Sequence, residues 1–170
     1  IHGLMVTGGW ADAVRRVRAV LDRDPENLSA LRDLSRGLIH LGRLDEAAEA
    51  AVRATTIAPW SAQALMVEAD VEHRRGHSER ALGLIDQALA LDDRLLEARL
   101  DRSRYLAALD RNDEAAREIE PLIEGSGDNP WVALRYVEVV ELPAEDYRMA
   151  EDRLRTVLSR NPYLAEAWLM

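Results

Sequence analysis

The chain has 170 residues, 48% of them hydrophobic, and carries a formal net charge of −9 at pH 7. This composition is ordinary for a globular protein, and no apolar run approaches the ~18 residues of a membrane-spanning helix. An acidic chain argues against nucleic-acid binding, which requires a basic face. Cysteine is absent, which excludes disulfides and thiolate chemistry and leaves cytoplasmic and periplasmic locations both open.

One sequence pattern recurs along the chain. The stretch Gly42-Arg43-Leu44-Asp45-Glu46-Ala47 predicts a turn followed by an amphipathic helix that ends at Pro59. Similar stretches begin at residues 8, 76, 110 and 145. Equivalent junction positions lie 34 residues apart from Pro25 to Pro59 and again from Pro59 to Asp93, and the next spacings are 37 and 32. A period near 34 predicts a repeat protein built from helix–turn–helix units.

Small residues occupy the positions where the two helices of each unit should cross. Ser35 on the first helix faces Ala47 on the second, and Ala69 faces Ala81 in the next unit. Small side chains allow antiparallel helices to approach to roughly 8–10 Å. We therefore expect Ala47 and Ala81 to be buried.

The residues between Leu28 and Pro59 resemble the tetratricopeptide repeat family, with its small and large positions taken by Ala30, Leu31, Leu34, Ser35, Leu38, Gly42, Leu44, Ala47, Ala51, Ala54 and Ile57. The run Asn161-Pro162-Tyr163-Leu164-Ala165-Glu166-Ala167-Trp168 is similar to a junction and first turn of that family. The resemblance implies an all-α fold, a right-handed superhelical α-solenoid of about four to five helix pairs.

This resemblance divides the chain into one solenoid with partial repeats at both ends. The expected units are a partial repeat at 1–25, repeats at 28–61, 62–95 and 96–130, a degenerate repeat at 131–162, and the start of a further repeat at 163–170. The first and last units begin and stop within a helix, which suggests a segment of a longer protein. Missing partner helices at these ends predict end-to-end self-association.

Two places depart from the repeat pattern. Pro121 falls inside a second helix and is expected to kink or end it near Glu120, before a longer junction at residues 125–129. In the degenerate repeat, Glu138 stands where a small residue is expected, and Pro143 is expected to shorten the first helix.

First helices line a concave groove in the family, which implies a set of partner-binding positions here. Those that we select are Arg32, Arg36, Met66, Val67, Asp70, Arg74, Leu100, Arg104, Arg135, Tyr136 and Val139. Four of the arginines are expected to form a row that holds an acidic or carboxylate-bearing peptide: Arg32, Arg36, Arg74 and Arg104. Apolar contacts are expected beside this row. The alternative is a solvated face with internal ion pairs.

Other site types are disfavoured. The chaperone-clamp form of the family needs basic residues where Glu97 and Asp101 stand, so that function is not expected. His73 and His77 have i, i+4 spacing, but Gly76 lies between them at the helix end, which disfavours a metal site. No local signature of a catalytic constellation or cofactor site is present. We predict no enzyme activity, no cofactor and no metal.

Three functions are compatible with the pattern. The leading one is a non-catalytic scaffold that binds a protein or peptide partner, without nucleic acid or direct membrane insertion. The resemblance also allows a periplasmic segment of a bacterial polysaccharide export or secretion machine. A third alternative is the regulatory arm of an enzyme whose catalytic domain lies outside this chain.

Overall fold

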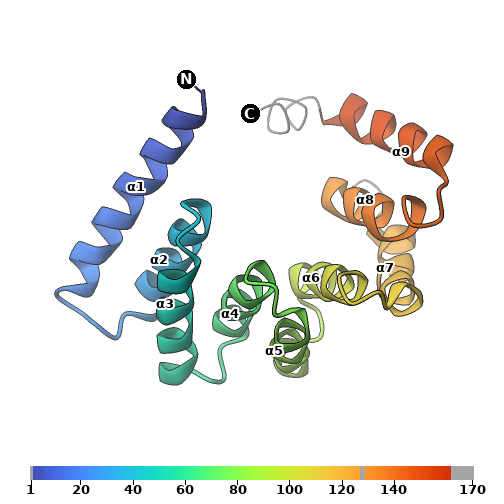
Figure 1. The fold of residues 1–170 in the computed structure, drawn as a ribbon. Helices are drawn as coiled ribbons and strands as arrows, with labels where there is room; N and C mark the ends of the chain where they lie inside the picture. The colour runs from blue at the N-terminus through green and yellow to red at the C-terminus, as the bar shows by residue number, and fades with distance from the viewer. Residues whose placement is uncertain (1, 127–128, 162–170) are drawn as a thin grey trace. The chain divides into compact units, whose positions relative to one another are not determined.

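The computed structural model describes the backbone of residues 2–126 and 129–161, and side chains over 9–123 and 129–161. Within these ranges the regular elements are helices, which confirms the predicted all-α solenoid of helix pairs (Figure 1). The helices are α1 (His2–Leu21), α2 (Leu28–His40), α3 (Leu44–Ile57), α4 (Ala62–Arg74), α5 (Ser78–Leu91), α6 (Leu96–Ala107), α7 (Asn112–Ser126), α8 (Pro130–Tyr136), the π-helix η1 (Val137–Glu141) and α9 (Tyr147–Arg160).

The chain divides into two compact units, Ile1–Leu95 and Leu96–Met170. In the first unit each helix from α1 to α5 packs on the next, and the first helices α2 and α4 also contact each other. In the second unit α6 packs on α7, α7 packs on α8 and η1, and α9 packs on α8 and η1. The repeat boundaries themselves stay predictions, and the predicted further repeat at 163–170 lies outside the described residues.

The helix crossings have the predicted small residues at their centres. Ala47 and Ala81 are both fully buried, which confirms that prediction. The buried Ser35 hydroxyl donates a hydrogen bond of 2.9 Å to the Ala47 carbonyl. The hydroxyl therefore has a partner at the crossing of the two helices, as buried polar groups require. Leu31 and Leu38 fill the space beside this crossing and are buried at 0% and 1% exposure.

The turns inside the helix pairs share one backbone feature. Gly42 and Gly76 have φ of 71° and 87°, and Asp110 and Glu145 at the matching places both have φ of 59°. Each of these residues ends a first helix in the left-handed region, where glycine carries no steric penalty. The recurrence of this conformation shows the repeat in the backbone as well as in the sequence.

Two residues predicted to interrupt helices do not end them. The Gly8–Gly9 pair does not form a turn, because α1 is one continuous helix from His2 to Leu21. Glycine inside a helix costs only about 1 kcal/mol relative to alanine, which packing against α2 can offset. Likewise Pro121 does not end α7, which continues to Ser126. Pro121 removes one backbone donor, but buried Ile119 and Ala115 hold the helix in place on its inner face.

In the degenerate repeat, a π-helix allows Glu138 to lie on the exposed side of the first helix. After Tyr136 the α-helix passes into η1, and the wider turn changes which residues face inward. Val137 and Val139 are buried, while Glu138 is exposed and pairs with Arg135 at 2.6 Å. Valines on both sides of Glu138 therefore face inward, and the first helix continues as η1 up to Glu141.

Candidate partner-binding groove

A groove of about 500 Å³ opens in the first unit between α1, α2 and α4. Its volume lies within the range of about 300–1,000 Å³ that is usual for binding pockets. The residues that line it are Trp10, Ala13, Val17, Asp33, Arg36, Gly37, Ile39, His40, Asp70 and Arg74. The floor is mostly apolar, and the charged side chains come from α2 and α4.

The close approach of α1 to α2 shapes one wall of the groove. A Cβ placed on Gly37 would lie 2.7 Å from Cγ2 of Val14, so only glycine fits at this crossing without a shift. The Val14 side chain is itself buried, with 4% exposure. Farther along the same two helices, the rings of Trp10 and His40 stack with centroids 4.0 Å apart and an interplanar angle of 9°. These contacts fix the position of α1 beside the groove.

The charges in the groove are balanced in sign. On α4, Arg74 Nε lies 3.1 Å from Asp70 Oδ2, so this pair is closed. On α2, Asp33 and Arg36 are exposed, and neither makes a hydrogen bond or ion pair within the part of the chain that the structure describes. The groove thus offers one cation and one anion to a ligand, in a chain of net charge −9.

Three of the predicted binding residues line this groove: Arg36, Asp70 and Arg74. Arg32 lies one turn before Arg36, is half-buried and does not line the groove. The apolar members of the predicted set are interior residues, with exposures of 7% for Met66, 3% for Val67, 9% for Leu100 and 1% for Val139. Their burial corrects the expectation that they offer apolar contacts to a partner.

The remaining predicted residues belong to the second unit and are engaged there. Arg104 Nη2 pairs with Asp101 Oδ1 at 2.8 Å. Burial lowers the pKa of the Arg135 guanidinium, against the opposing charge of Glu138. Tyr136 lies under the Arg153 guanidinium, whose carbon is 4.7 Å from the ring centroid. Of the four arginines expected to form a row, Arg36 and Arg74 line the groove of the first unit, and Arg104 belongs to the second unit.

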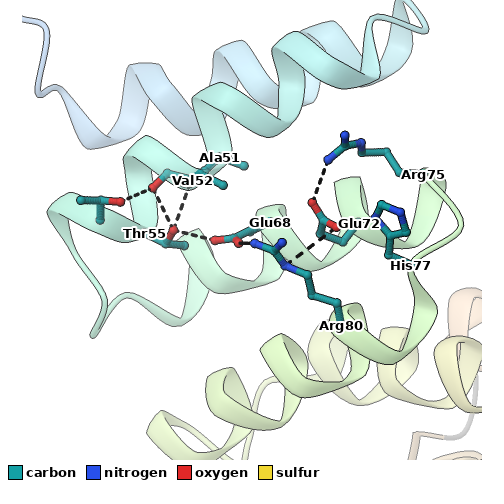
Figure 2. A network of polar contacts seen from close by, with 9 residues as sticks. Ala51, Val52, Thr55, Glu68, Glu72, Arg75, His77 and Arg80 are labelled. Atoms are coloured by element: carbon teal, nitrogen blue, oxygen red, sulfur yellow. Dashed lines mark hydrogen bonds and ion pairs between the residues drawn. The ribbon is translucent and has the colours of Figure 1, made fainter.

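A buried polar network on the other side of α4 was not found by sequence reasoning (Figure 2). Glu68 is 5% exposed and accepts hydrogen bonds from Thr55 Oγ1 at 2.6 Å and from Arg80 Nη2 at 3.0 Å. These two contacts connect α4 to α3 and to α5. A sequence signal did exist, because Glu68 and Glu72 are acids at i, i+4 spacing, which places them on one face of the helix.

Glu72 is the second buried acid of the network, with 2% exposure. It accepts from His77 Nδ1 at 2.8 Å and from Arg75 Nη1 at 3.1 Å, and Arg75 also reaches Asp45 on α3 at 3.2 Å. Burial alone would raise the pKa of the Glu72 carboxyl. The His77 hydrogen bond and the charges of Arg80 and Arg75 outweigh it, so the pKa lies below its ordinary value.

The second unit also joins helices through a half-buried glutamate, Glu118, and a buried one, Glu141. Glu118 on α7 receives Arg99 Nε at 2.7 Å and Arg102 Nη1 at 2.6 Å, both from α6. Glu141 on η1, with 5% exposure, pairs with Arg153 of α9 at 2.7 Å. Arginine–glutamate contacts between helices are thus a structural feature of this chain, separate from the groove.

The two histidines that were considered for metal are engaged in local hydrogen bonds. His77 contacts Glu72, and His73 Nδ1 lies 3.1 Å from Ser78 Oγ. Among the described residues there is no group of three potential ligands that could hold a metal ion. The described residues also include no helix with the length and apolar character of a membrane span.

Comparison with known proteins supports the fold. The family model described as tetratricopeptide repeat matches residues 2–64, whereas none of the curated proteins compared with the chain matches it. The solved structure of TTC0263, a thermophilic tetratricopeptide protein in Thermus thermophilus, is similar with a TM-score of 0.80 and 21% identity, covering 98% of this chain and 94% of that one.

Two similar structures concern peptide binding. YrrB, a tetratricopeptide protein with an unusual peptide-binding site, has a TM-score of 0.63 and 16% identity over 94% of this chain and 81% of its own. The first tetratricopeptide domain of Spaghetti, bound to an HSP90 peptide, has a TM-score of 0.61 and 19% identity over 69% and 93%. The family-model match over residues 2–64 and the shared fold support a helical solenoid of the tetratricopeptide type.

Proposed function

We propose that this protein is a non-catalytic interaction scaffold that binds a segment of a partner protein in the groove of its first unit. The observation that carries the proposal is the groove itself. It has a volume of about 500 Å³ and a mostly apolar floor, and the exposed Arg36 borders it. A scaffold role is consistent with the tetratricopeptide fold, and two of the similar structures are peptide-binding proteins by their descriptions. The two alternative functions, a segment of an export machine and the regulatory arm of an enzyme, stay predictions. The groove neither favours nor disfavours them.

The ligand geometry follows from the shape of the site. An extended segment presents alternate side chains to one surface, so that every second residue can enter the groove. The Trp10–His40 stack gives one end of the groove a rigid aromatic wall against which an apolar side chain can pack. Arg36 can donate paired hydrogen bonds to a carboxylate, which a lysine could not fully replace.

The test starts from peptides selected on the intact chain from an unbiased displayed library of 12-residue sequences. The affinity of the strongest peptide is measured by calorimetry for wild type, Arg36→Glu and Arg23→Glu. Arg23 is a matched control because it is exposed, lies between α1 and α2, and does not line the groove. We expect Arg36→Glu to weaken binding about tenfold, because reversal replaces an attraction by a repulsion.

Binding is located by the backbone amide and indole resonances of the protein. Groove binding predicts shifts at Trp10, Gly37 and His40, with little change on α3 and α5. Equal weakening by Arg23→Glu, or shifts confined to α3 and α5, would place the functional surface elsewhere and overturn the proposal.

A further inference from the structure

The groove face of α2 carries two opposite charges that do not neutralise each other. Asp33, Arg36, Gly37 and His40 follow the i, i+3, i+4, i+7 spacing of one helix face, and all four line the groove. Asp33 and Arg36 are within reach of one another at i, i+3. Nevertheless, they form no ion pair with each other or elsewhere in the described part of the chain.

Pairs with the same or similar spacing elsewhere in the protein do close. Arg43 pairs with Glu46 at 2.6 Å and Arg111 with Glu114 at 2.7 Å, both at i, i+3. The pair across the groove on α4, Asp70 with Arg74, closes at i, i+4. Asp33 and Arg36 are therefore the two groove charges still available for contacts with a ligand.

A ligand of a single charge sign fits this arrangement poorly. An acidic segment would pair with Arg36 but would bring a like charge toward Asp33, and a basic segment would do the reverse. Like charges brought together at an interface disfavour binding, and a charge that is covered without a partner costs desolvation free energy. This argument disfavours the purely acidic peptide that the sequence alone predicted.

The order of features along α2 gives the order of features in the ligand. Asp33 comes first, Arg36 lies about 4.5 Å farther along the helix axis, and His40 with its Trp10 stack lies about one turn beyond. In an extended ligand, alternate residues point the same way with a spacing of roughly 6.6 Å. That spacing is close enough for flexible charged side chains to meet both α2 charges.

Resting on the proposed function of the groove, we infer that its occupant is an extended partner segment with basic, acidic and apolar residues at alternate positions. The basic residue pairs with Asp33, the acidic residue pairs with Arg36, and the apolar residue packs beside the Trp10–His40 stack. The inference specifies the order of the side chains and not the chain direction of the segment, because the recognition is by side chains.

The experiment uses three synthetic peptides of equal length and composition on the intact chain. One has the order basic, acidic, apolar at alternate positions, the second interchanges the two charges, and the third separates the charges at opposite ends. A pair of purely acidic and purely basic peptides completes the set. Binding is measured by calorimetry and by the shift of the Trp10 indole resonance, against wild type and the double variant Asp33→Arg/Arg36→Glu.

We expect wild type to prefer the first peptide over the second by about tenfold, and the double variant to reverse that preference. The double variant keeps the net charge, so a general electrostatic effect would not reverse the order. A circular dichroism spectrum equal to that of wild type would confirm that the double variant is folded. If the double variant does not fold, Arg36→Glu alone is used in its place.

Several outcomes would overturn the inference. Peptides that shift Trp10 regardless of charge order, or a clear preference for the purely acidic peptide, would contradict the mixed-charge ligand while leaving the groove as the binding site. Trp10 shifts that appear on raising the protein concentration without peptide would identify a second copy of the chain as the occupant. No shift in the groove with any peptide, including those selected from the library, would refute the proposed function as well.

Discussion

The contact between Gly37 and Val14 determines how closely α1 lies to α2, and Gly37→Ala tests it directly. The new methyl group would begin 2.7 Å from Val14 Cγ2, a distance that requires a shift. Val14 is β-branched and buried at 4% exposure, so its side chain has little freedom to rotate away. Overpacking of this kind costs about 1–3 kcal/mol.

A second effect opposes the clash. Replacing glycine by alanine inside a helix stabilises it by about 1 kcal/mol through helix propensity. The net expectation is a loss of about 0–2 kcal/mol. To separate the two effects, Gly37→Ala is combined with Val14→Ala, which removes the Cγ2 methyl group that blocks the new Cβ. The double variant should lose less unfolding free energy than the two single variants lose together, by about 1–2 kcal/mol.

The measurement is chemical denaturation followed by circular dichroism, together with hydrogen exchange of α1 and α2 amides. Exchange is informative because repeat proteins can open locally at one end. The Trp10 indole signal should also change in Gly37→Ala, since displacement of α1 alters its stacking on His40. Strictly additive single and double variants, to within about 0.3 kcal/mol, would refute the close packing described here.

Two further predictions concern the core of the first unit. Ala47→Leu should overpack the crossing beneath Ser35 and lower the unfolding free energy by about 1–3 kcal/mol, and an unchanged denaturation midpoint would contradict the repeat register. Glu72→Gln should cost about 1–3 kcal/mol near neutral pH by removing the charge that Arg75, His77 and Arg80 surround. Because the folded pKa of Glu72 lies below its unfolded value, its stabilisation is present above the unfolded pKa and is lost as pH falls through the folded pKa. Wild type should thus lose stability more steeply than Glu72→Gln between about pH 6 and pH 3, and parallel curves would show that the carboxylate is not preferentially ionised in the fold.

The fold was predictable because each helix crossing depends on local sequence. Gly42 and Gly76 mark the turns by their left-handed backbone, and Ala47 and Ala81 mark the crossings by their size. These constraints act within one helix pair, so a single repeat is enough to read them. The predicted turn at Gly8–Gly9 and the predicted helix end at Pro121 fail for the same reason, because packing keeps a helix continuous through residues of low helix propensity.

The site was less predictable because it depends on contacts between repeats. Carrying the family groove over by position gave Arg36 and Arg74, which do line the groove. The same procedure gave Val67, which instead belongs to one core cluster with Leu31 and Leu34 of α2. Consecutive first helices pack on each other here, so apolar residues between them are buried rather than presented to a ligand. The role of Gly37 was invisible for the same reason, as its constraint comes from Val14 on another helix.

Helix α4 shows how the chain separates charges that hold the fold from charges that face the groove. Glu68 and Glu72 lie on one side and bind side chains of α3, α5 and the intervening turn, whereas Asp70 and Arg74 border the groove. At 100° per residue, positions two apart point to nearly opposite sides of a helix, which places these two sets on different faces. The buried network thereby fixes the rotation of α4 about its axis, and with it the position of the groove wall that faces Asp33 and Arg36. Those two residues are exposed and take no part in that network, so a ligand can use both without dismantling the contacts that build the site.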